Sequence, residues 1–139
     1  MHCGDGHCYP AVSVYAKQVE EVKKEIYKTR GINVEHVVVT ASMSLFPGAW
    51  SFLTVWIIDE ESATFWDEVG TLGWLRIDHL RHRTVERYGI WYPVVIDVVV
   101  QSYALGLVGT EDSTFSMVSQ LRVLDWNGGV VRSVNMRDT

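Results

Sequence analysis

The fold prediction depends mainly on one apolar stretch, WYPVVIDVVVQSY, which spans residues 91 to 103. Every position from Val94 to Val100 is aliphatic except Asp97. A run that is apolar at nearly every position favours a strand buried on both faces, in the middle of a sheet. We therefore predict a central strand from Trp91 to about Tyr103.

The clearest helical pattern lies upstream, between Pro10 and Gly31. Apolar residues recur there at alternating spacings of three and four, which places them on one helical face: Val12, Tyr15, Val19, Val22 and Ile26. Pro10 suits the first turn of a helix and Gly31 suits its end. An alternative interpretation makes residues 11 to 15 a short first strand, with the helix beginning near Ala16.

A β-hairpin is predicted next. Residues 34 to 43 are rich in β-branched side chains that alternate with polar ones, residues 45 to 48 contain a Pro-Gly pair, and Trp50 to Ile58 is again apolar. Two strands joined by a turn at Pro47-Gly48 explain this order.

The pattern then returns to helical spacing. N-cap candidates at residues 59 to 62 precede a segment that extends to Tyr88, and Gly70 and Gly73 divide it into a short and a longer helix. After the central strand, alternation from Phe115 to Val123 predicts a strand. A turn at residues 127 to 129 leads into another strand from Val130 to Met136, with a helix over residues 113 to 124 as the weaker alternative.

These elements predict one α+β domain over residues 10 to 139, preceded by a flexible leader of residues 1 to 9. Its sheet is mostly antiparallel with two helices packed on one face. With the optional first strand, the order becomes the (β)αββαβ arrangement of a ferredoxin-like fold, extended by a C-terminal hairpin.

Composition limits the function classes. The chain has 139 residues, 47% of them hydrophobic and 21% charged, which is typical of a single globular domain. Its net charge of −5 disfavours binding to nucleic acid or to an anionic membrane. The apolar runs are far shorter than the roughly 20 residues that span a bilayer. The N-terminus lacks the pattern of a signal peptide, so we expect a cytoplasmic location.

Two groups of residues have the chemistry of metal ligands. Cys3, His7 and Cys8 lie close together in the leader, with His2 beside them, and thiolate and imidazole are zinc ligands. A local disulfide or a simple mobile terminus explains the same residues. On the predicted longer helix, His79, His82 and Glu86 share a face and form the ligand set of a catalytic zinc or a non-haem iron. A solvated helix face is the competing interpretation.

Charged residues supply two further candidates. Arg76, Arg83 and Arg87 form a basic edge on the same predicted helix, where a phosphate or a nucleic-acid backbone would bind. Salt bridges to nearby acids are the alternative. Asp97 interrupts the apolar run, and burial raises the pKa of a carboxyl group. It is therefore the one candidate for catalysis, although pairing with an arginine or with Tyr103 explains it too.

Aromatic residues are abundant, with 6 Trp, 6 Tyr and 4 Phe. Trp50 and Trp56 share one face of the predicted hairpin, and Phe46 lies at its tip. Six tryptophans are difficult to bury completely in a small core. Because no phosphate-binding loop and no hydrolase motif is present, we expect a non-catalytic binding or assembly domain that self-associates as a homo-oligomer, a dimer first, or that binds another protein. A metal-binding protein and an anion- or nucleic-acid-binding protein are the alternatives.

Overall fold

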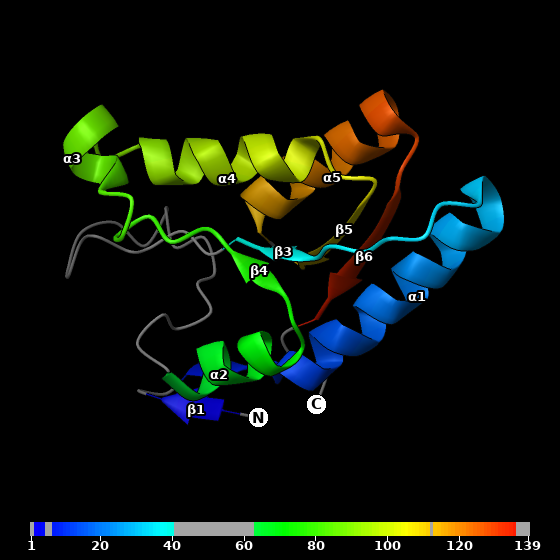
Figure 1. Ribbon diagram of the computed structural model, residues 1–139, viewed down its shortest axis with the longest axis horizontal. Coiled ribbons are helices and arrows are strands. Elements are labelled where there is room, and N and C mark those ends of the chain that lie inside the picture. The colour runs from blue at the N-terminus through cyan, green and yellow to red at the C-terminus, as the bar shows by residue number, and fades with distance from the viewer. Residues whose placement is uncertain (1, 5–6, 41–62, 112, 136–139) are drawn as a thin grey trace.

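The computed structural model describes residues 2–4, 7–40, 63–111 and 113–135, and these form five helices and three two-stranded sheets (Figure 1). The helices are α1 (Val12–Arg30), α2 (Ala63–Thr71), α3 (Thr84–Tyr88), α4 (Tyr92–Ser102) and α5 (Thr114–Asn127). The strands are β1 (His2–Gly4), β2 (His7–Tyr9), β3 (Val38–Val39), β4 (Leu75–Arg76), β5 (Gly106–Thr110) and β6 (Val130–Val134).

The centre of the fold is a β5–α5–β6 unit. The two strands are parallel over their full lengths, from Gly106 opposite Val130 to Thr110 opposite Val134. Parallel neighbours need a crossover connection, and α5 provides it. The side chain of Ser113 accepts a hydrogen bond from the backbone N–H of Ser116 at 3.3 Å, which caps the first turn of α5.

Helices α1 and α5 cover opposite faces of this strand pair. A Cβ added at Gly106 would lie 2.4 Å from Cγ1 of Val22 in α1, and one added at Gly109 would lie 2.7 Å from Nε2 of Gln120 in α5. Strand residues three positions apart point to opposite faces, so the helices lie on the two sides of the pair. The order of layers is therefore α1, then β5 and β6, then α5, with α4 packed against α5.

The predicted first helix is confirmed. Helix α1 begins at Val12 and ends before Gly31, whose φ of +68° is in the left-handed region that favours glycine. The alternative strand over residues 11 to 15 is wrong, since those residues lie in or beside α1. Arg30, the last residue of the helix, donates hydrogen bonds to the backbone carbonyls of Asn127 and Gly128, which ties α1 to the end of α5.

The predicted central strand is wrong, because Tyr92 to Ser102 form helix α4. Pro93 lies in the first helical turn, a position that proline favours. The run of valines predicts a strand buried on two faces, but it belongs to a helix with two apolar sides. Apolar residues on both sides leave no helical period in the sequence. Periodicity alone cannot distinguish such a helix from a buried strand.

The predicted fold class is also wrong. The strand pairs β3–β4 and β5–β6 are parallel, and among the described residues only the short β1–β2 pair of the leader is antiparallel, so the chain is neither mostly antiparallel nor ferredoxin-like. Residues 115 to 123 are helical, which was the weaker alternative. The turn at residues 127 to 129 does not join two strands of a hairpin. It ends helix α5, with Gly128 at a φ of +54°. The strand that begins at Val130 is confirmed as β6, while β5 was not predicted.

The region between α1 and α4 differs from the prediction as well. Helix α2 ends at Thr71, β4 follows, and residues 79 to 83 form turns before the short helix α3, so the predicted longer helix is wrong. Strand β3 belongs to the predicted strand of residues 34 to 43, but it pairs in parallel with β4. The predicted returning strand, Trp50 to Ile58, lies outside the described residues.

Candidate functional site

A chain of three buried polar side chains joins the turn before α3 to helix α4. Nε2 of His79 lies 2.8 Å from Oδ1 of Asp97, and Nδ1 of His79 lies 3.2 Å from the hydroxyl oxygen of Thr84. All three residues are buried, and the side chains of His79 and Asp97 are each only 5% exposed. The hydrogen bond to Asp97 therefore forms away from water, where an interaction with an ionised group is strong.

The turn that carries His79 is fixed by its own hydrogen bonds. Oδ1 of Asp78 accepts the backbone N–H of Arg81 at 2.9 Å, and this bond, together with the charge of Arg76, lowers the pKa of Asp78. The backbone N–H of Thr84 donates to the carbonyl oxygen of His79 at 3.0 Å. Arg83, which lies between Arg81 and Thr84 in the turn, adopts a φ of 52°. This left-handed conformation costs a non-glycine residue about 1 kcal/mol. The side chain of His79 is thus held toward α4.

Asp97 has one carboxylate oxygen that its neighbours do not satisfy. Oδ1 pairs with His79, but Oδ2 is buried and has no hydrogen-bond partner among the described residues. Burial raises the pKa of Asp97, and the hydrogen bond and charge of His79 oppose that rise only in part. An unsatisfied buried carboxylate oxygen is costly, so its presence needs an explanation.

Asp97 lines a cavity of about 620 Å³. Its walls come from the inner sides of α1 and α4, the segment of residues 32 to 40, strand β5 and the first turn of α5. Most of the lining residues are apolar, and this volume is that of a site for a small organic molecule. The cavity lies on the side of α4 that also carries Val94 and Val98, because positions 94, 97, 98 and 101 share one helical face.

Gln101 lines the same cavity and has a second unsatisfied oxygen. It lies one helical turn after Asp97, so both side chains project from one face of α4. Its Nε2 donates to the hydroxyl oxygen of Thr40 at 2.5 Å, whereas its Oε1 is buried and has no hydrogen-bond partner among the described residues.

The opposite wall contains a satisfied polar pair. The hydroxyl of Tyr15, from α1, lies 3.0 Å from the hydroxyl oxygen of Thr110 at the end of β5. Burial raises the pKa of Tyr15, so its phenol stays protonated and can act as a donor. The cavity therefore combines apolar walls with hydrogen-bonding groups that differ in kind, and the two buried, unsatisfied ones are both acceptors.

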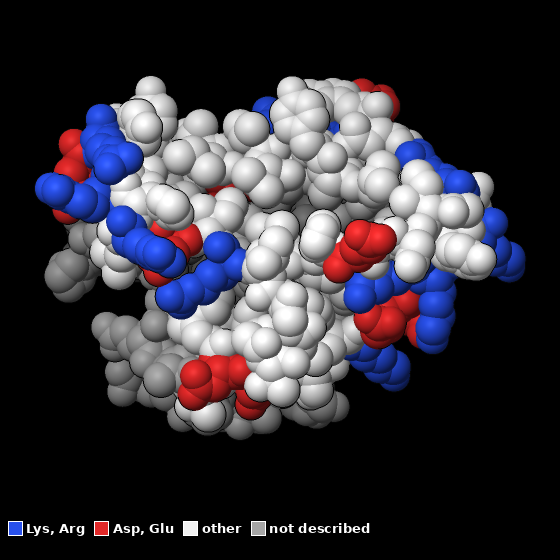
Figure 2. Space-filling model, viewed as in Figure 1, with Lys and Arg blue, Asp and Glu red and all other residues white. Residues whose placement is uncertain are grey.

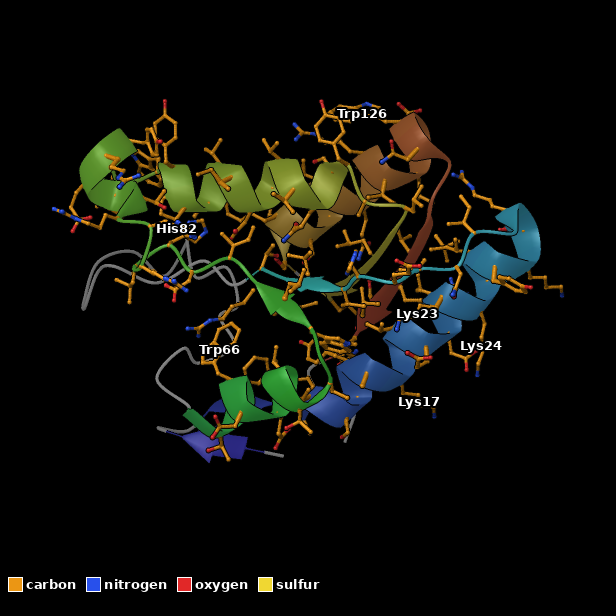
Figure 3. The ribbon with its side chains drawn as sticks, viewed as in Figure 1. Lys17, Lys23, Lys24, Trp66, His82 and Trp126 are labelled. Atoms are coloured by element: carbon orange, nitrogen blue, oxygen red, sulfur yellow. The ribbon has the colours of Figure 1, made fainter. Side chains whose placement is uncertain are left out.

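The predicted helical metal set is not brought together. His79 points to Asp97, Glu86 lies 3.5 Å from Arg83, and His82 is exposed near α3 (Figure 3). Within the part of the chain that the structure describes, no group of three or more His, Cys, Asp or Glu side chains has the arrangement of a metal site. For the leader, the backbone register pairs Cys3 with Cys8, but its side chains are outside the description. Zinc binding there stays a prediction.

The predicted basic edge is a looser group of charges than expected. Arg76 lies over the ring of Trp66, 4.8 Å from its centroid, and pairs with Asp78 at 3.0 Å. Arg83 and Arg87 belong to α3 and the turn before it, and Figure 2 shows the blue Lys and Arg side chains of this region gathered at one end of the molecule. Trp66 lies above α2 on the side of β4 (Figure 3). Anion binding here stays a prediction.

The predicted aromatic binding residues Phe46, Trp50 and Trp56 lie outside the described residues. Conversely, no sequence pattern indicated the hydrogen bond between His79 and Asp97, which are 18 positions apart. Gln101 was missed because the stretch was treated as a strand, in which residues four apart have no special relation. The helical spacing of Asp97 and Gln101 was the signal that could have identified them.

Comparisons with protein-family models, with curated proteins and with solved structures find no match to this chain. Over the described residues, no helix combines the length and the apolar character needed to cross a membrane. The functional argument therefore depends on the cavity and its chemistry.

Proposed function

We propose that this chain is a binding domain for a small polar molecule that carries at least two hydrogen-bond donors. The observation that carries the proposal is the pair of buried, unsatisfied acceptors, Oδ2 of Asp97 and Oε1 of Gln101, on two residues that line one cavity. A buried acceptor without a partner costs about 1–3 kcal/mol, and more when it is charged. A ligand that donates to both oxygens removes that cost.

The same geometry describes the chemical class of the ligand. A donor group that is cationic, such as an amidine or a guanidine, fits a carboxylate best, because a charge-assisted pair is about twice as strong as a neutral one. A neutral pair of hydroxyls fits the two oxygens in the same way but more weakly. The aliphatic walls favour a ligand with an apolar body beside its donor groups.

His79 has a positioning role in this proposal. By holding Oδ1 of Asp97 at 2.8 Å, it fixes the carboxylate and leaves the other oxygen, Oδ2, as the one without a hydrogen-bond partner. Thr84 in turn fixes the imidazole through Nδ1. A rigid acceptor loses less entropy when it binds a ligand than a mobile one does.

Thermal unfolding with a panel of small molecules tests the proposal. Benzamidine and cis-cyclohexane-1,2-diol carry the expected donors, and benzoate is the matched compound without them. At a concentration of about 100 times the Kd, a ligand stabilises the folded protein by about 2.7 kcal/mol. We expect benzamidine to raise the Tm more than benzoate does.

Substitutions link that effect to the two oxygens. Asp97→Asn and Gln101→Met should each weaken binding of the stabilising compound at least about tenfold, equivalent to about 1.4 kcal/mol. The control, Asp125→Asn, makes the same chemical change at an exposed position of α5. The proposal is refuted if no donor-bearing compound stabilises the protein, or if Asp97→Asn binds as tightly as the unchanged chain.

A further inference from the structure

The side of α4 that faces away from the cavity has the character of an interface, and Tyr103, which follows the helix, borders both this surface and the cavity. Six apolar or aromatic side chains form a continuous outer stripe along α3, α4 and the end of α5: Tyr88, Tyr92, Val95, Val99, Tyr103 and Trp126. Val95 and Val99 are 51% and 46% exposed, and Tyr103 is 74% exposed. Positions 92, 95, 99 and 103 share one helical face, so the stripe is a single surface.

Ring contacts extend the stripe beyond both ends of α4. The rings of Tyr88 and Tyr92 are 5.6 Å apart, and those of Tyr103 and Trp126 are 6.3 Å apart, measured between centroids. Figure 3 shows Trp126 projecting outward from α5 beside the end of α4. The stripe is therefore aromatic at its two ends and has valines in the middle.

Charge is missing from the middle of this surface. The only charged residue of α4 is Asp97, which is buried on the inner side. Figure 2 shows the same gap, with white atoms over α4 between the charged groups of α3 and those near α5. With the exposed neighbour Trp91, the residues of the stripe expose on the order of 800 Å² in total, which is comparable to what each partner buries in a standard interface.

We propose that the outer stripe is the contact surface for a second copy of this chain, with the two α4 helices packed antiparallel about a twofold axis. The spacing of the stripe suggests this partner because it reads nearly the same in both directions: an aromatic residue, two valines and an aromatic residue. An antiparallel pair centred on the level of Asp97 places Val95 against Val99 of the second copy. It also places Tyr92 against Tyr103 of that copy, to within one residue.

The charges at the ends of the stripe favour the same orientation. Arg87 is next to Tyr88, and Asp125 is next to Trp126, and both side chains are exposed. Antiparallel packing brings the Arg87 end of one copy to the Asp125 end of the other, and parallel packing does not. Arg122 also lies near this end, but it is partly buried, covers the Trp126 ring at 5.1 Å and donates to Ser102 at 3.3 Å. Complementary rim charges set orientation more than affinity.

Analytical ultracentrifugation of the full chain at several concentrations tests this proposal. We expect a monomer–dimer equilibrium, and the double substitution Val95→Glu with Val99→Glu should raise its Kd at least about 100-fold, because it places four carboxylates in the contact. The control, Tyr27→Glu, changes a residue of α1 that is 63% exposed and lies outside the stripe. It should leave the Kd unchanged.

Disulfide trapping tests the register without placing charge in the contact. In a Cys3→Ser, Cys8→Ser background, Val95→Cys chains mixed with Val99→Cys chains should cross-link faster than either variant alone. A chain that stays monomeric at about 1 mM overturns the proposal, as does a dimer that the glutamate variant leaves intact. Adsorption of the monomer to phosphatidylcholine vesicles, abolished by the same glutamates, would assign the stripe to a lipid surface and also overturn it.

Discussion

Replacing His79 with alanine should destabilise the protein more than any other single histidine substitution among its described residues. The imidazole makes two buried hydrogen bonds, one to Asp97 and one to Thr84. A bond to a charged group contributes about 1.5–3 kcal/mol and a neutral one about 1 kcal/mol. Loss of both, with the void left by the ring, agrees with the roughly 3–5 kcal/mol that breaking a buried pair costs.

Urea denaturation at pH 7 measures this cost directly. The midpoint should fall without a change in slope, and the Tm should fall by roughly 10–15 °C for a domain of this size. His82→Ala is the matched control, because His82 lies three positions away and is exposed. Its free energy of unfolding should stay within about 0.5 kcal/mol of the unchanged protein.

A second substitution separates loss of the pair from loss of the ring. If the carboxylate of Asp97 is the group left without a partner, then Asp97→Asn should partly rescue His79→Ala by removing the charge. The double variant should be more stable than His79→Ala alone by at least about 1 kcal/mol. A cost below about 1 kcal/mol for His79→Ala, or additive losses in the double variant, would refute the pairing as the source of stability.

Two other predictions follow from Asp97 and from the glycines. Because burial raises the pKa of Asp97, the folded state holds more protons than the unfolded state just above pH 3.8. The free energy of unfolding should therefore fall as pH rises through the folded pKa, by at most about 1.4 kcal/mol per pH unit. Urea titrations at several pH values should show that Asp97→Asn lacks this slope. Gly129→Ala places a Cβ 2.5 Å from the carbonyl oxygen of Leu105 and should lower the free energy of unfolding by about 1–3 kcal/mol. Gly70→Ala in α2 meets nothing within 4 Å, so it should be neutral or should raise the free energy of unfolding by up to about 1 kcal/mol. Calorimetry measures both changes.

Local signals in the sequence predicted what depends on local physics. Helix α1 has one apolar face and a glycine at its end, so its period and its boundary were both visible before the structure. The strand at Val130 was visible for a similar reason, since it follows a glycine pair and is rich in β-branched residues. What the sequence did not contain was the partner of each strand, and pairing decides whether a sheet is parallel.

Helix α4 shows why the candidate site was only partly predictable. Asp97 was identified because a carboxylate stands out in an apolar run, and the structure places it on a cavity wall. Its partner His79 lies in a turn that was expected to be a helix, with its side chain expected on a solvated face. Gln101 is an ordinary polar residue unless α4 is known to be helical. Each side of α4 is apolar for its own reason, the cavity on one side and the exposed stripe on the other, which hides the helical period.

The position of α1 has a consequence for how the chain reaches this fold during its synthesis. The buried residues of α1, Val22 and Ile26, pack against strands β5 and β6, and β6 ends at Val134, roughly a hundred residues later. At about 5–20 residues per second, the ribosome needs on the order of 5–20 s to synthesise that stretch of chain. Until both strands have been made, the apolar face of α1 lacks part of its native covering. A nascent chain stalled before β5 should therefore be sensitive to protease along α1 and should bind a chaperone that recognises exposed apolar helices.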